Sequence, residues 1–120
     1  MITQNQIRNT LSRALSIIEN PNNWIKNTEA IDANKESVLP EDPTAVKYCL
    51  IGALEKSSYE LFPDITRYAI VVEAEKQIED MIEKIPTIKE YLLGLEEFND
   101  APETKHEDVI HILEKTIANL

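Results

Sequence analysis

The sequence predicts an all-α fold, a compact bundle of about five helices around a central apolar helix at residues 43–58. Three observations predict this fold. Apolar residues recur at spacings of three and four along several segments, as one face of a helix requires. Three segments begin with a threonine that is followed three residues later by Gln or Glu, a signature of helix starts. No segment shows sustained alternation of apolar and polar residues, so a sheet is not expected.

The first predicted helix begins at Thr3, which pairs with Gln6 as a capping signature, and ends before Asn20 and Pro21. Its apolar face is formed by Ile7, Leu11, Ala14, Leu15 and Ile18. The following stretch, residues 22–40, is rich in Asn and Asp and holds only isolated large apolar side chains. We expect a short helix or turn there, followed by a loop.

The central helix is predicted to begin at Asp42 and Pro43, because Asp accepts the free N–H groups of a first turn and Pro fits the first helical position. Residues 45–54 are apolar on nearly all sides, which is typical of a helix that neighbours surround. Within it, Gly52 would let another helix approach closely.

The next predicted helix follows Pro63 and Asp64 and ends at Pro86. Its buried stripe is predicted to be Ile65, Tyr68, Ala69, Val72, Ile78, Met81, Ile82 and Ile85. Its solvated face would carry Glu73, Glu75, Glu79, Asp80 and Glu83.

Two shorter helices complete the prediction. Thr87 and Glu90 would begin one that continues through Tyr91, Leu92 and Leu95, and residues 99–102 would form a turn. Thr104 and Glu107 would begin the terminal helix. The apolar stripe of that helix is Val109, Ile112, Leu113, Ile117 and Leu120.

Composition restricts the function. With 120 residues and 42% apolar side chains, the chain has room for one domain, residues 1–120, around a single core. The net charge of −10 opposes direct binding to nucleic-acid phosphates or to an anionic membrane. The two glycines stand apart, so the clustered glycines of phosphate-binding loops are missing and we expect no nucleotide cofactor. The first 40 residues are neutral, and the rest carry the excess charge.

Location is inferred from the same composition. The sequence shows neither a membrane-spanning apolar run nor a signal peptide, and its one cysteine, Cys49, cannot form an internal disulfide. These observations predict a cytoplasmic protein that does not enter a membrane.

No residue pattern predicts a catalytic or metal site. His106 and His111 are five residues apart, which places them off a common helical face, and Glu107 could instead pair with His111 on the surface. Cys49 lies in the most apolar segment, where a thiol is normally a small inert hydrophobic group. The single tryptophan, Trp24, could be a core anchor or an interface residue.

Several short motifs resemble a family of small uncharacterised bacterial and phage domains. The family pattern has a Trp, then Ala-x-Asp, then Ala-Val-x-Trp-Cys-x-x-Gly-Ala, and finally Trp-Asn-Asp-x-Pro followed by Thr. The matching segments are Trp24, residues 30–32, residues 42–54, residues 98–100, Thr104 and Val109. This sequence has Tyr48 and Phe98 where the pattern usually has Trp, and Asn34 or Lys35 where the loop typically has Gly. The resemblance covers most of the chain and implies a single domain, but no activity.

The motif residues suggest a candidate site. It would consist of Trp24, Asp32, Tyr48, Cys49, Phe98, Asn99 and Asp100. If the loops near Asp32 and Asn99 converge on Tyr48, they would form a small pocket with two carboxylates and an amide. The alternative is that Asp32, Asn99 and Asp100 only satisfy backbone N–H groups at turns and helix starts.

Three functions remain compatible with these observations. The favoured one is a non-enzymatic protein-interaction or regulatory module, which binds a protein partner or self-associates. The second is a small-ligand-binding or hydrolytic site built from Asp32, Asn99 and Asp100, so enzymatic activity stays open. The third is an acidic mimic of nucleic acid, which requires carboxylates of residues 73–100 in rows at phosphate spacing.

Overall fold

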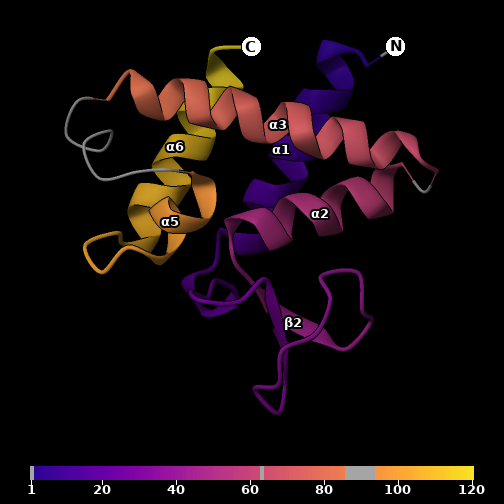
Figure 1. Ribbon diagram of the computed structural model, residues 1–120, viewed down its shortest axis with the longest axis vertical. Helices are drawn as coiled ribbons and strands as arrows, with labels where there is room; N and C mark the ends of the chain where they lie inside the picture. The colour runs from indigo at the N-terminus through magenta and orange to yellow at the C-terminus, as the bar shows by residue number, and fades with distance from the viewer. Residues whose placement is uncertain (1, 63, 86–93) are drawn as a thin grey trace.

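The computed structural model describes residues 2–62, 64–85 and 94–120, and these form a mostly helical domain with a small sheet (Figure 1). In Figure 1, α3 runs across the bundle with α2 beneath it, and the sheet projects below the helices. The helices are α1 (Gln4–Ile18), α2 (Leu50–Leu61), α3 (Thr66–Glu83), α5 (Leu95–Asp100) and α6 (His106–Ala118). The other elements are a 3-10 turn (Pro21–Asn23) and two strands, β1 (Ala30–Asp32) and β2 (Ala45–Tyr48).

Helix α1 confirms the first predicted helix. The Thr3 hydroxyl accepts a hydrogen bond from the Gln6 backbone N–H, and the Gln6 side chain accepts one from the Thr3 N–H, so both halves of the capping box form. Leu11, Ala14 and Ile18 are fully buried, because α1 packs against α2, α3 and α6. The apolar face read from the sequence is therefore the face that enters the core.

The predicted central helix at 43–58 is wrong in its first part. Residues 45–48 form β2, which pairs antiparallel with β1 in the register Ala30 with Tyr48, Ile31 with Lys47 and Asp32 with Ala45. The carboxylate of Asp42 accepts hydrogen bonds from the backbone N–H and hydroxyl of Thr44, which closes a turn instead of starting a helix. The expectations that residues 30–32 lie in a loop and that no sheet forms are also wrong. The backbone N–H and C=O groups of residues 30–32 pair with those of residues 45–48.

Gly52 has a steric role, although its neighbour is not a helix. A Cβ atom at Gly52 would lie 2.0 Å from the backbone carbonyl oxygen of Glu29. The same carbonyl accepts a hydrogen bond from the Cys49 N–H at 3.1 Å, one turn earlier on the chain. The segment before β1 therefore lies directly against the first turn of α2.

Helix α3 confirms only part of its predicted stripe. Its buried residues are Ile70, Ala74, Ile78 and Ile82, at spacings of four. Ile65, Tyr68 and Val72 were predicted to be buried, but they are 82%, 60% and 64% exposed, and Ala69 is also exposed. The first half of this segment has apolar residues on two faces, and only one of them can face the core.

In the C-terminal part, two helix boundaries differ from the prediction. Residues 99 and 100, which were predicted to lie in a turn, end helix α5, and α6 begins one residue later than predicted. The carboxylate of Asp108, not Glu107, accepts the hydrogen bond from the N–H at the start of α6, that of Lys105, at 2.8 Å. Val109, Ile112 and Leu113 are buried, which confirms the predicted stripe. The predicted helix start at Thr87 and Glu90, with Tyr91 and Leu92, lies outside the described residues.

Across residues 2–62, 64–85 and 94–120, no helix combines the length and the apolar character needed to cross a membrane.

Replacing Gly52 tests the close approach of Glu29. We expect Gly52→Ala to lower the free energy of unfolding by about 1–3 kcal/mol, because the added methyl group overlaps a backbone carbonyl that cannot simply rotate away. Urea denaturation would measure this loss. Gly94→Ala is the matched control, because its Cβ would meet nothing within 4 Å and its φ of 172° is ordinary extended backbone. Equal stability of the two variants would contradict the close approach.

Candidate functional site

Three of the sequence-predicted site residues, Trp24, Asn99 and Asp100, meet around the side chain of Asn99, which is fully buried at the end of α5. Its Oδ1 accepts hydrogen bonds from Trp24 Nε1 at 2.7 Å and from the Leu50 N–H at 3.0 Å. Its Nδ2 donates to the Ile25 carbonyl at 3.1 Å and to the carboxylate of Asp100 at 2.9 Å. These four bonds use the full hydrogen-bonding capacity of an amide.

Asp100 extends this network to the loop that follows Trp24. Its Oδ1 also accepts a hydrogen bond from the backbone N–H of Asn27, at 2.8 Å, where the chain turns through a positive φ of 72°. Beside it, the ammonium of Lys26 donates to the Ala101 carbonyl at 2.6 Å and lies 5.6 Å from the centre of the Trp24 ring. The end of α5 is thus tied to residues 24–27 by side chain to backbone bonds.

Asp32 takes part in a separate turn. Its Oδ1 accepts hydrogen bonds from the backbone N–H groups of Asn34 at 2.8 Å and Glu36 at 3.0 Å. The turn places Lys35 at a positive φ of 66°, where a Gly would be the easier residue. No recorded hydrogen bond joins Asp32 to Asn99 or Asp100, and this carboxylate serves its own loop.

The remaining predicted residues, Tyr48, Cys49 and Phe98, are all buried. The Sγ atom of Cys49 accepts a hydrogen bond from the Gly52 N–H at 3.3 Å and so caps α2. Burial is the main cause that raises the pKa of the Cys49 thiol, to about 11, so the thiol is protonated and a weak nucleophile at neutral pH. The hydroxyl of Tyr48 donates to the Ala45 carbonyl at 3.3 Å.

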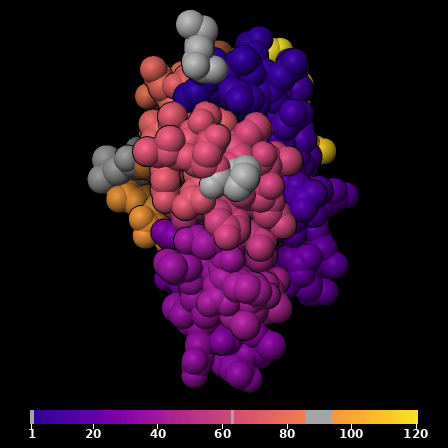
Figure 2. All heavy atoms as spheres, turned by 90° about the vertical axis from the view of Figure 1, so that its right-hand side faces the viewer, coloured from indigo at the N-terminus to yellow at the C-terminus, as the bar shows by residue number. Residues whose placement is uncertain are grey.

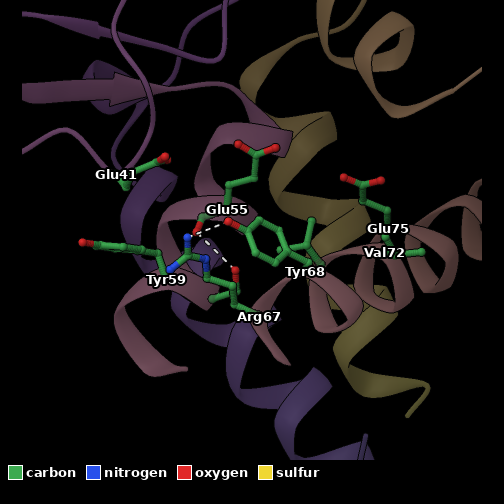
Figure 3. A pocket seen from close by; sticks show the side chains of 9 residues that line it. Glu41, Glu55, Tyr59, Arg67, Tyr68, Val72 and Glu75 are labelled. Carbon is green, nitrogen blue, oxygen red and sulfur yellow. Dashed lines mark hydrogen bonds between the residues drawn. The ribbon is translucent and has the colours of Figure 1, made fainter. Parts of the chain in front are cut away.

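A second site, which the sequence did not single out, lies between α2 and α3. It is a cavity of about 300 Å³ that we call the α2–α3 groove. Tyr59 from α2 and Tyr68 and Val72 from α3 line it, and these side chains are 40%, 60% and 64% exposed. Figure 3 shows the ring of Tyr68 between Glu55 and Arg67, with Glu41 and Glu75 on either side. The groove therefore combines an aromatic and apolar floor with three carboxylates: Glu41, Glu55 and Glu75.

Arg67 fixes the aromatic side chains of the groove. Its guanidinium carbon lies 5.0 Å from the centre of the Tyr59 ring and 4.7 Å from that of the Tyr68 ring. Its Nη2 also donates a hydrogen bond to the hydroxyl of Tyr68 at 2.7 Å. A guanidinium held against two rings limits their rotation, so these tyrosines present a defined surface.

The carboxylates of the groove repel one another. The pKa of Glu55 is raised to about 7, mainly by burial and then by the charges of Glu29, Glu41 and Glu75 and a hydrogen bond to Glu29. Burial also raises the pKa of Glu75. The ion pairs recorded in the described part of the chain join Glu60 to Arg13 and to Lys56, and neither involves a groove carboxylate.

The apolar residues that line this groove are visible in the sequence, but their pattern does not show whether they are buried or exposed. Tyr68 and Val72 were assigned to the buried stripe, and Glu75 to a solvated face. Ile70 and Ala74 extend the buried residues Ile78 and Ile82 of that stripe toward the start of the helix at spacings of four, whereas Tyr68 and Val72 lie on another face. Two competing series in one helix indicate that one of them is left for something other than the core.

Comparison with known proteins places the chain in a family. It belongs to a family of unknown function, DUF6197, whose family model matches residues 2–119. The searches of curated proteins and of solved structures found no significant match. The resemblance to a family of uncharacterised domains is thereby confirmed, and the family supplies no activity.

The Asn99 network can be tested by truncation. We expect Asn99→Ala to lower the free energy of unfolding by about 2–4 kcal/mol, because the Trp24 indole N–H and the buried Leu50 N–H lose their acceptor. Urea denaturation followed by Trp24 fluorescence would measure the loss. The control is Asn9→Ala on the exposed face of α1. A variant at position 99 as stable as that control would contradict a structural role for the amide.

The raised pKa of Glu55 has a consequence for stability. The folded protein binds the Glu55 proton more tightly than the unfolded chain, whose carboxyl has the ordinary pKa of 4.5, so Glu55 lowers stability as pH rises from that value through about 7. We expect Glu55→Gln to become more stable than the wild type across this window, by about 1 kcal/mol after allowance for solvent screening of a half-buried group.

Urea denaturation between about pH 5 and pH 8 would measure this difference. Glu114→Gln, at an exposed position of α6, is the matched control and should follow the wild type. If both variants show the wild-type dependence on pH, Glu55 does not have the raised pKa.

Proposed function

Because the family to which this chain belongs carries no assigned function, we propose from the geometry that the protein is a non-enzymatic interaction module, which binds a segment of a protein partner in the α2–α3 groove. One observation carries this proposal. Exposed aromatic and apolar side chains gather at one cavity on two adjoining helices, and one of them is held in place by Arg67.

Isolated exposed apolar residues are normal, but a group beside a cavity marks a binding surface. Tyr59, Tyr68 and Val72 line the groove, and Leu61, the last residue of α2, and Ile65, just before α3, are also exposed. Figure 2 faces this side of the molecule, with the end of α2 and the start of α3 above the segment that carries β1 and β2. Aromatic side chains are also the residues that contribute most to protein interfaces.

The hydrogen bonds of the motif residues support a binding role over a hydrolytic one. The amide of Asn99 has no free donor or acceptor, and Asp100 and Asp32 each accept two hydrogen bonds from within the protein. A general base or nucleophile needs an open lone pair directed at a substrate, which the Asn99 amide lacks, and the Oδ1 atoms of Asp32 and Asp100 are engaged in two separate parts of the protein.

A displayed library of short random peptides, selected on the immobilised protein, tests the proposal. We expect enriched peptides to bind the wild type and to bind a Tyr68→Ala, Val72→Ala double variant at least about tenfold more weakly, because two side chains of the contact surface are lost. Isothermal titration calorimetry would measure the affinities.

The control for that experiment is Val46→Ala, which truncates an apolar side chain of β2 that is 46% exposed and lies outside the groove. It should bind the selected peptides like the wild type. Selection of no peptide, or equal affinity for the double variant, would overturn the proposal. So would a stable dimer that the double variant abolishes, because the face would then bind a second copy of the chain.

A further inference from the structure

We infer that the partner segment carries a lysine or arginine, whose cation lies among Glu41, Glu55 and Glu75 while neighbouring apolar side chains cover Tyr68 and Val72. This inference rests on the proposed function and specifies the chemistry of the partner.

Charge complementarity favours a cationic partner. The carboxylate of Glu55 faces Glu29 from the segment before β1, Glu41 from the segment before β2 and Glu75 from α3. All of these charges have one sign, and they disfavour the ionised form of Glu55. A cation in the groove would relieve this repulsion, whereas a neutral segment would bury carboxylates without compensation and an acidic one would increase the repulsion.

A second copy of this chain is a poor occupant on the same grounds. Two copies joined by a symmetric contact would bring the same carboxylates face to face, in a protein whose net charge is already −10. The apolar surface of Tyr68 and Val72 would be covered, but the like charges beside it would oppose the contact.

Arg67 limits where a cationic side chain can lie. Its guanidinium already lies near the rings of Tyr59 and Tyr68, so the partner's cation would lie beside the carboxylates and away from Arg67. A partner lysine or arginine has a long apolar stem that can lie along the exposed part of Tyr68 while its charged end reaches the carboxylates. The exposed Val72 then accepts an apolar neighbour from the same partner segment.

Binding of such a cation would be linked to a proton. The pKa of Glu55, about 7, means that this carboxyl is partly protonated at neutral pH, and a hydrogen bond joins it to Glu29. A bound cation favours the ionised form, so association would release a fraction of a proton and would strengthen as pH rises from about 6 to 8. The other charged groups that line the groove are Glu41, Arg67 and Glu75.

The experiment uses two synthetic peptides, acetyl-Ser-Leu-Lys-Leu-Ser-amide and the same peptide with Gln in place of Lys, titrated into the full chain labelled with ¹⁵N. We expect the lysine peptide to shift the backbone amide signals of α2 and α3 beside the groove. We also expect it to bind about fivefold to tenfold more tightly than the glutamine peptide. The wild-type affinity for the lysine peptide should rise between about pH 6 and pH 8.

Glu55→Gln should remove both the preference for lysine and the dependence on pH. Glu41→Gln, in the loop before β2, should reduce the preference for lysine and serves as the second variant if Glu55→Gln unfolds. Glu114→Gln on the exposed face of α6 is the control and should behave as the wild type. The amide spectrum of each variant reports whether it is folded.

Three results would overturn the inference. Equal binding of the two peptides in the groove would show that the cation contributes nothing, while the proposed function would stand on the peptide selection. Shifts confined to other surfaces, or no shifts, would show that the groove does not receive such a segment. Binding of spermidine as tight as that of the lysine peptide would show that a free amine suffices and that the apolar contacts of a protein segment play no part.

Discussion

The rest of the architecture depends on the hydrogen bonds of the Asn99 side chain. One buried amide binds the indole of Trp24, the carbonyl of Ile25 and the first N–H of α2 at Leu50, and so joins three parts of the chain that are far apart in sequence. The bond to Leu50 fixes where α2 begins, and Cys49 caps the same turn. Because a helix cannot extend back through this point, the preceding residues are free to pair as β2 with β1. A partly satisfied amide at this depth would cost more than an apolar residue, which explains why all four of its bonds are made.

The sequence predicted well what local patterns control. The bounds of α1 follow from one capping box and one apolar stripe, and the stripe of α6 follows from regular spacing. The pairing of β1 with β2 was not predicted, because residues 45–48 lie in an apolar run that favours a helix and carry no local strand signal that outweighs it. The bond from Leu50 to Asn99, a residue that is distant in sequence, sets the boundary between strand and helix. Tertiary contacts of this kind override local preference in short strands.

The two sites were predictable to different degrees. The motif pointed to Trp24, Asn99 and Asp100, which the structure joins by hydrogen bonds, but spacing alone could not show that their polar atoms bind one another. The groove was missed because Tyr68 and Val72 lie in a helix with two apolar series. Which series is buried depends on how α3 meets α1 and α6, and the sequence of α3 does not specify that angle. From sequence alone, an exposed apolar residue in an amphipathic helix is therefore predicted to be buried, and only the positions of the neighbouring helices show that it is not.

The two sites are physically connected through Glu29. The network around Asn99 anchors residues 24–27, and the chain then continues until the carbonyl of Glu29 rests on Gly52 and accepts the hydrogen bond from Cys49. This placement brings the carboxylate of Glu29 to Glu55, nearly one helical turn after Gly52, where it raises the pKa of that groove carboxyl. A side chain at Gly52 would push Glu29 away, so the small residue of the motif controls the charge of the groove as well as the packing of α2. The motif residues around Asn99 thus contribute to the placement of Glu29 beside Glu55.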